Sequence, residues 1–161
     1  IECYRGSLNN VFLRFRNIIK IYDPDIVVRI SADSPFIDSK LIDKSIRLFL
    51  TKRVDIVTNI FKRTYPKGQS IEVFNKQIFL KPKNLKLNSF EKEHVSPFFY
   101  KNKKKYKIYN FESKKNLSKY NLTVDFKNDL ILFNKIIKKN KIKRINYSYK
   151  NILKLITKDE N

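Results

Sequence analysis

The stretch Asp25-Ile26-Val27-Val28-Arg29-Ile30-Ser31-Ala32-Asp33-Ser34-Pro35 decides the fold of this chain. Its first half is a short, β-branched and nearly continuous apolar run, which is typical of a strand covered on both faces. Ser31 to Pro35 then reads as a loop. Asp33 is therefore expected just beyond the carboxyl end of a buried strand, where open α/β sheets place their functional residues.

The segments around this stretch alternate between helix and strand. Residues 9–22 carry apolar side chains at helical spacing, and Pro24 ends that run. Asp38 is a good N-cap for a helix over 39–52, and Val54–Ile60 is a second apolar strand. The order helix, strand, helix, strand predicts parallel strands joined by crossover helices.

The rest of the chain has shorter elements and no repeat or flexible linker. The pattern predicts strands over 70–74, 106–111 and 121–125, a helix over 90–100 broken at Pro97, a helix from 127 or 128 to about 140, and a last helix over 148–157. Residues 75–89 have no clear pattern. We expect residues 1–161 to form a single α/β domain.

The strongly positive charge admits two interpretations. The chain has 36 Lys and Arg against 15 Asp and Glu, for a net charge of +21. Most of the excess is Lys, which shares A/T-rich codons with the abundant Asn and Ile. The basic runs 101–107 and 138–144 fall at predicted turns and helix ends, without a nucleic-acid-binding motif. We therefore expect no nucleic-acid partner, but a positive field that favours anionic substrates.

Composition also limits the compartment and the kinds of site. No apolar run approaches the roughly 20 residues needed to span a membrane, so no membrane partner is expected. The one cysteine, Cys3, allows neither an internal disulfide nor a cysteine-rich zinc site, and a reducing cytoplasm fits. The chain starts at Ile1 without a signal pattern and contains no Met. We interpret it as a piece of a protein whose start lies upstream.

Two aspartates could form a metal site. Asp33 follows the first strand, and Asp125 ends the predicted strand over 121–125. Carboxylates at strand ends in one crevice suit Mg²⁺, which takes one or two carboxylates together with substrate phosphates. The alternative is that each aspartate only caps the turn or helix that follows it, and spacing does not choose between these readings.

Other candidates for chemistry are few. The single histidine, His94, could act as a base or a substrate hydrogen-bonder, although a lone histidine is more often structural. No Ser-His-Asp or Cys-His arrangement is evident. The only glycines are Gly6 and Gly68, so the chain has no glycine-rich phosphate loop.

Five blocks in order resemble the cytidylyltransferase family of acylneuraminate (CMP-sialate) synthetases, and most nearly its branch of spore-coat polysaccharide biosynthesis proteins. The blocks are Arg5-Gly6-Ser7 with Asn10-Val11 and Arg14; Val28 to Asp38; Arg63-Thr64-Tyr65-Pro66-Lys67-Gly68 with Ile71-Glu72-Val73-Phe74; Glu93-His94-Val95-Ser96-Pro97-Phe98; and Leu122-Thr123-Val124-Asp125 with Asp129-Leu130. Together they extend across nearly the whole chain.

The resemblance implies a Rossmann-like three-layer sandwich of the nucleotide-diphospho-sugar transferase type. It implies CTP, Mg²⁺ and an acidic sugar as partners, with a CMP-sugar for surface polysaccharide and pyrophosphate as products. By resemblance, Asp33 would be catalytic and would bind the metal together with Asp125. The family's nucleotide side would take Arg5, Ser7 and Arg29, and its sugar side would take Arg63, Tyr65, Glu72, Glu93 and His94.

Departures from the family pattern leave an alternative open. The N-terminal strand and phosphate loop of the family are absent, so the chain would be the C-terminal two-thirds of such a domain and inactive by itself. Ser70 replaces an Asp before the Ile71–Phe74 run, and Asn10 replaces another. A non-catalytic or truncated relative that binds a nucleotide or sugar is the alternative. Relatives of this kind often pair, so a homodimer is also an open expectation.

Overall fold

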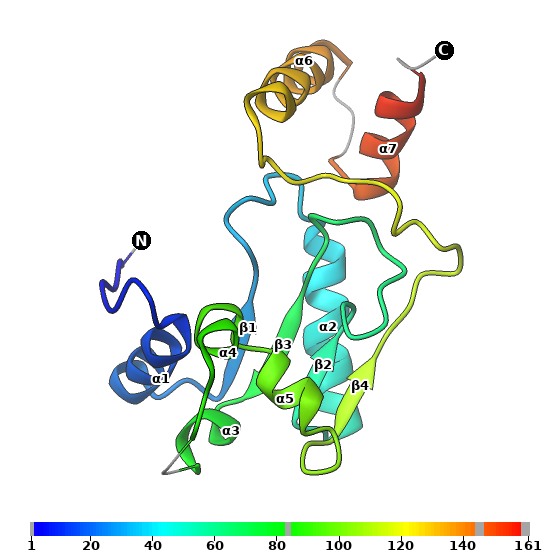
Figure 1. Ribbon diagram of the computed structural model, residues 1–161. Helices are drawn as coiled ribbons and strands as arrows, with labels where there is room; N and C mark the ends of the chain where they lie inside the picture. The colour runs from blue at the N-terminus through cyan, green and yellow to red at the C-terminus, as the bar shows by residue number, and fades with distance from the viewer. Residues whose placement is uncertain (1, 83–84, 144–146, 159–161) are drawn as a thin grey trace.

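The computed structural model describes residues 2–82, 85–143 and 147–158, except for the side chains of 139–143 and 158. Within these residues, helices cover both faces of one four-stranded sheet (Figure 1). The elements are α1 (Val11–Tyr22), β1 (Ile26–Arg29), α2 (Ser39–Lys52), β2 (Ile56–Thr58), β3 (Glu72–Asn75), α3 (Gln77–Leu80), α4 (Ser89–His94), α5 (Pro97–Lys101), β4 (Ile108–Asn110), α6 (Lys127–Lys143) and α7 (Tyr149–Lys158).

The strand order corrects one expectation. The sheet runs β1-β3-β2-β4, with β3 antiparallel to both of its neighbours and β2 parallel to β4. β1 and β2 therefore share a direction, as predicted, but they do not pair, because β3 lies between them. A helix over 39–52 returns the chain to the other end of the sheet, so it predicts that β2 runs parallel to β1. It does not indicate which strand lies between β1 and β2.

Alternation along the strands separates two cores. Ile56 and Phe74 lie on one face of the sheet, in a cluster with α1, α3 and α5. Val57 and Val73 lie on the other face, in a cluster with α2, α6 and α7. Because side chains of a strand alternate between faces, each central strand contributes to both cores. The expected three-layer α/β sandwich is confirmed.

The helices begin and end much as their capping residues indicate. The carboxylate of Asp38 accepts the Lys40 N–H at the start of α2, as predicted. The helical spacing of the apolar residues predicts that Tyr22, Leu50 and Leu130 face inward, but all three side chains are exposed by half or more. Each lies in the first or last turn of its helix, where the helix extends past the core.

Two segments differ from, or refine, the sequence prediction. Residues 121–125 form no strand, and a single bridge between Lys67 and Asn121 replaces it. The helix expected over 90–100 is two helices, α4 and α5, with Pro97 at the first turn of the second. The break at Pro97 follows from its missing N–H, which is tolerated only at a helix start.

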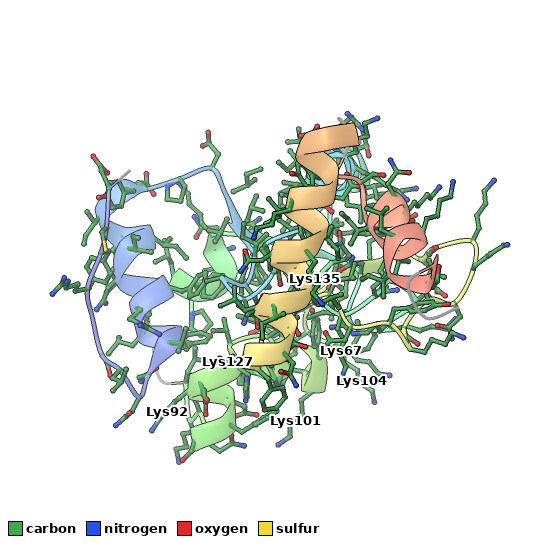
Figure 2. The ribbon with its side chains drawn as sticks, turned by 90° about the horizontal axis from the view of Figure 1, so that it is seen from above. Lys67, Lys92, Lys101, Lys104, Lys127 and Lys135 are labelled. Carbon is green, nitrogen blue, oxygen red and sulfur yellow. The ribbon has the colours of Figure 1, made fainter. Side chains whose placement is uncertain are left out.

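The lysines are spread over many elements. Those labelled in Figure 2 lie on α4, α5, α6 and the connecting loops, and their side chains extend outward from the ribbon. Arg144, at the end of the second basic run, lies outside the described residues. No helix in the described part of the chain is long and apolar enough to cross a membrane.

Candidate functional site

Asp33 lies in the loop that follows β1, with its side chain exposed to solvent. The hydroxyl of Ser34 donates to Asp33 Oδ1 over 2.8 Å. Within the described residues, no hydrogen bond engages Asp33 Oδ2. The strand ends at Arg29, so the loop carries Asp33 beyond the carboxyl end of β1, where it was expected.

Backbone contacts bring Asp125 to the same place. The N–H of Val124 donates to the Asp33 carbonyl over 2.9 Å, which fixes the residue before Asp125 against the Asp33 loop. Leu122 anchors the segment from the other side, because it is fully buried and its N–H donates to the Lys67 carbonyl. Asp125 thus reaches the site from an irregular segment and not from the end of a strand.

Gly68 permits this docking. Its φ is +84°, and a Cβ atom at this position would lie 2.5 Å from the carbonyl oxygen of Leu122. Both the left-handed backbone and the close approach of a neighbouring backbone require glycine. The Arg63–Gly68 block of the sequence is therefore a turn whose end is shaped to receive the Leu122 segment.

Asp33 and Asp125 line one small cavity of about 230 Å³. Its other side chains come from the loop after β1, from the turn before β3 and from Thr123, and they are mostly polar. The hydroxyl of Thr123 lies 2.7 Å from both Asp125 Oδ2 and Asn121 Oδ1 and shares its one proton between them, while Asp125 Oδ1 has no hydrogen bond from the described residues. Two carboxylates with one open oxygen each fit a hard cation that takes its remaining ligands from water or phosphate.

Asp125 does not serve as the cap of α6. The side chain of Asp129 accepts the N–H groups of Asp125 and Phe126 at 3.0 and 2.8 Å, so Asp129 holds the turn before the helix. For Asp33, in contrast, the structure also supports the interpretation that it is a turn residue, since the Ser34 N–H donates to the Ser31 carbonyl and closes a turn around it. No cluster of three or more His, Cys, Asp or Glu suited to a metal occurs among the described residues.

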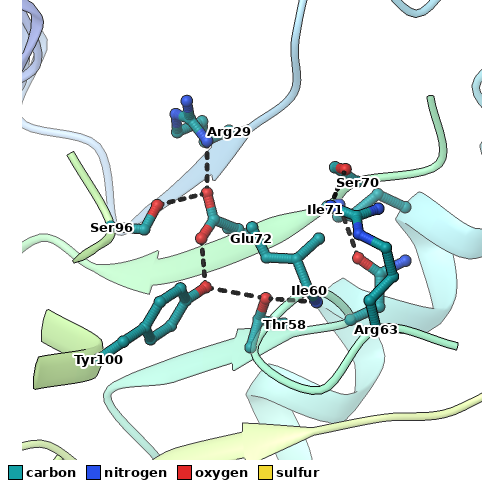
Figure 3. Close-up of polar contacts among 10 residues, drawn as sticks. Arg29, Thr58, Ile60, Arg63, Ser70, Ile71, Glu72, Ser96 and Tyr100 are labelled. Atoms are coloured by element: carbon teal, nitrogen blue, oxygen red, sulfur yellow. Dashed lines mark hydrogen bonds and ion pairs between the residues drawn. The ribbon is translucent and has the colours of Figure 1, made fainter. Parts of the chain in front are cut away.

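Arg63 contributes a partly satisfied guanidinium to the cavity. Its Nη2 donates to Ser70 Oγ over 3.1 Å, whereas its Nη1 is buried and has no hydrogen-bond partner (Figure 3). Burial lowers the pKa of Arg63, and the nearby Glu72 and Tyr100 partly oppose that effect. An arginine stays charged at neutral pH in such surroundings. The cavity is therefore lined by a positive group with incomplete hydrogen bonding, beside two carboxylates.

Glu72 is the centre of a buried polar network beside this cavity (Figure 3). Arg29 Nη1 lies 2.6 Å from Glu72 Oε2, and the Ser96 hydroxyl donates to the same oxygen over 2.7 Å. The Tyr100 hydroxyl donates to Oε1. Burial, and then the Glu72 charge, raise the pKa of Tyr100 far above its usual range. The Glu72 side chain is 1% exposed, so it faces protein groups and not the open cavity.

A strained turn delivers Ser96 to this network. Val95 has φ +66° and ψ −63°, and the Ser96 N–H donates to the His94 carbonyl over 2.7 Å, which makes a γ-turn centred on a β-branched residue. Such a conformation costs on the order of 1–3 kcal/mol and persists where the surroundings enforce it. Val95 is fully buried, and its packing holds the turn.

The other predicted site residues lie apart from the two aspartates. Tyr65 is buried against Phe111 and Tyr149 and lines a different cavity. Glu93 and His94 are exposed on α4, where the His94 ring contacts Phe90. The N-cap of α4 is Asn88, and its capping box is completed by Glu91 and not by Glu93.

The N-terminal candidates, Arg5 and Ser7, are exposed in the coil before α1. Sequence reasoning missed Thr58, Lys67, Ser96 and Tyr100. Lys67 and Ser96 lie inside two of the five sequence blocks, so the predicted site residues beside them were the only indication that they belong to the site. Tyr100 and Thr58 gave none, because their proximity to Glu72 depends on the packing of α5 against the sheet.

Comparison with known proteins matches this chain to a protein family. The family described as "Cytidylyltransferase" matches residues 1–156. The uncharacterized protein MJ1063 of Methanocaldococcus jannaschii is 33% identical over 136 residues, covering 83% of this chain and 54% of that protein. The spore coat polysaccharide biosynthesis protein SpsF of Bacillus subtilis is 26% identical over 129 residues, covering 78% and 52%.

A solved structure agrees with the fold. A cytidylyltransferase from Leptospira borgpetersenii superposes with a TM-score of 0.86 at 32% identity, over 98% of this chain and 66% of that one. The chain spans about half the length of the curated relatives it matches.

Proposed function

Since the chain belongs to the cytidylyltransferase family, we propose that the complete protein is a Mg²⁺-dependent enzyme that transfers CMP from CTP to an acidic sugar for surface polysaccharide. The observation that carries this proposal is the shared cavity of Asp33, Asp125 and Arg63. It combines groups that attract a metal with a group that attracts an anion. The polysaccharide context rests on the name of the SpsF relative.

The metal part of the proposal rests on the chemistry of the two carboxylates. Asp33 and Asp125 would hold Mg²⁺, each through an oxygen without a hydrogen bond from the described residues. A bound Mg²⁺ would neutralise phosphate charge as the nucleotide reacts. The protein's own residues orient these carboxylates through the hydroxyls of Ser34 and Thr123.

The acidic nature of the sugar is supported by Arg63. Its Nη1 is buried without a partner, which costs about 1–3 kcal/mol unless a ligand supplies an acceptor. A carboxylate of the sugar would supply that acceptor. Ser70 matters here, because its single hydroxyl engages only one of the two terminal nitrogens. The Asp that the family pattern has at this position would compete for both.

Glu72 and Arg29 would then support the site through the buried polar network beside the cavity. The carboxylate of Glu72 is fully engaged by Arg29, Ser96 and Tyr100, so we assign it the role of holding these groups in place. Arg29, with a side chain 21% exposed, keeps part of its guanidinium available for a phosphate. The nucleotide role of Arg5 and Ser7 and the sugar role of Tyr65, Glu93 and His94 stay predictions.

A direct assay tests the proposal. The complete protein is incubated with CTP, Mg²⁺ and a panel of acidic nine-carbon sugars, and pyrophosphate release is measured. Release that depends on both the sugar and Mg²⁺ is expected. Binding of CTP and sugar without release would favour a non-catalytic relative. Absence of both, under conditions where a known cytidylyltransferase works, would contradict the proposal.

A further inference from the structure

A second cavity, of about 970 Å³, opens between α2, the segment 112–117 and α7. It shares no lining residue with the cavity of Asp33 and Asp125. The turn between β2 and β3 separates the two, since Tyr65 faces the large cavity while Arg63 and Lys67 line the small one. A volume of several hundred cubic ångströms is typical of small-molecule sites.

The lining of this large cavity is unusually basic. Seven of its sixteen residues are Lys or Arg, whereas the whole chain has 36 in 161. The seven come from three separate parts of the chain: Lys40, Lys44 and Arg47 from α2, Lys114 and Lys115 from the segment 112–117 after β4, and Lys150 and Lys154 from α7.

The two acidic side chains of the lining are already engaged. Glu112 pairs with Lys62 over 3.0 Å, and Asp38 accepts N–H groups from Lys40 and Tyr149 in capping positions. With seven basic and two acidic side chains, the lining of the cavity carries a clear excess of positive charge.

The inner wall of the cavity is apolar and aromatic. Leu41, Leu153 and Tyr65 are each less than one-tenth exposed and form this wall. Lys44 is held across it, with its Nζ 5.0 Å from the centroid of the Phe111 ring and 3.5 Å from the Tyr65 hydroxyl. The site thus presents a basic rim over a surface suited to a flat or apolar body.

We propose that this large cavity is a second ligand site, which takes a small organic phosphate carrying at least two negative charges on a flat or apolar body. The charge selects a multiply charged anion, and the apolar wall selects an organic body over an inorganic ion. A second copy of the chain is a poor occupant, because a two-fold contact would place identical basic surfaces against each other.

Matched charge variants test this site. Arg47, Lys114 and Lys150 are exposed, and no hydrogen bond or ion pair holds their side chains within the described residues. The triple variant Arg47→Gln/Lys114→Gln/Lys150→Gln removes three charges from the rim. The control Lys101→Gln/Lys103→Gln/Lys104→Gln removes three charges at and just after the end of α5, outside the lining. Figure 2 labels two of these residues, Lys101 and Lys104.

Binding of CDP, glucose 1-phosphate and inorganic pyrophosphate is measured by calorimetry in 0.15 M salt, with amide chemical shifts to locate each probe. CDP or glucose 1-phosphate should shift Leu41 and Leu153 and bind more tightly than pyrophosphate. Charge-assisted contacts contribute enough that the rim variant should lose at least about tenfold in affinity. The control should lose no more than about twofold, because exposed charges at a distance are screened.

Three results would overturn the proposal: no organic probe binds, both variants lose affinity equally, or the shifts cluster around Asp33 and Arg63. Which organic probe binds better identifies the body that the wall accepts. None of these readouts depends on nucleotidyl transfer, so this site can fail while the proposed function stands, and the reverse.

Discussion

Arg29 and Glu72 stand directly opposite each other on β1 and β3, and Arg29 Nη1 lies 2.6 Å from Glu72 Oε2. The register of the antiparallel pair, with Arg29 across from Glu72, places the two side chains on the same face of the sheet. The carboxylate is buried, so its charge depends on this partner and on the hydroxyls of Ser96 and Tyr100.

Removal of this partner should weaken the fold. Arg29→Met is expected to lower the free energy of unfolding by about 3–5 kcal/mol, because it leaves a buried carboxylate without its ion pair. Urea denaturation measures the change. The exposed Arg47→Met, on α2, is the control and should stay within about 0.5 kcal/mol of the parent. Equal values for the two variants would show that the Glu72 network does not depend on Arg29.

The raised pKa of Tyr100 predicts a pH dependence. Burial and the Glu72 charge keep the folded-state phenol protonated at a pH where the unfolded phenol, with a pKa of about 10, has ionised. The folded state then binds more protons, so this stabilisation is complete below about pH 10 and is lost as the pH rises toward the folded-state pKa. Stability at alkaline pH should fall more steeply in the parent than in Tyr100→Phe.

Urea titrations at several pH values from neutral to alkaline measure this difference in slope. Tyr100→Phe should also lose about 1–3 kcal/mol at neutral pH, because the Glu72 carboxylate loses a donor. Tyr147→Phe, at an exposed position, serves as the control and should follow the parent. Parallel curves for the parent and Tyr100→Phe would mean that Tyr100 ionises equally in both states.

The two glycines of the chain provide a matched pair for backbone strain. Gly68→Ala places a Cβ against the Leu122 carbonyl at a positive φ, and we expect a loss of at least about 1–3 kcal/mol. In Gly6→Ala the nearest atom is Cγ of the flexible Arg14 side chain, so the change should be small. Thermal unfolding measures both. A Gly68→Ala protein as stable as Gly6→Ala would mean that the Leu122 segment docks differently.

The two carboxylates of the small cavity should be essential for turnover in the complete protein. Asp33→Asn and Asp125→Asn are each expected to lower the rate of pyrophosphate release at least about 100-fold, because each removes charge stabilisation at the phosphates. Circular dichroism should show an unchanged fold. Asp43→Asn, exposed on α2, is the control. A normal rate in either cavity variant would remove that residue from the metal site.

Ser70 should set the strength of anion binding at Arg63. Ser70→Asp offers Arg63 a carboxylate at the position where it now has a hydroxyl, so we expect about tenfold weaker binding of an acidic sugar, in line with the loss of one charged hydrogen bond. Ser70→Ala frees Arg63 further and should not weaken binding. Calorimetry with the sugar alone compares the two. Equal weakening by both substitutions would mean that Ser70 itself contacts the sugar.

Much of this protein was readable from its amino-acid sequence. The apolar run of 26–29, the Asp38 cap and the break at Pro97 each specified an element, because strand burial, capping and the missing proline N–H act over a few residues. The five blocks indicated the family. The loop predicted after the first strand correctly located Asp33 beyond the carboxyl end of β1.

Only the tertiary structure decided which groups meet. Local patterns set the elements, but the insertion of β3 between β1 and β2 depends on hydrogen bonds between residues far apart in sequence. The same holds for Asp125, which reaches Asp33 through the Val124 N–H and the Gly68 turn and not as part of a strand. Within one sequence block, the turn sends Arg63 to the small cavity and Tyr65 to the large one. That division depends on side-chain packing against distant segments, which no local pattern encodes.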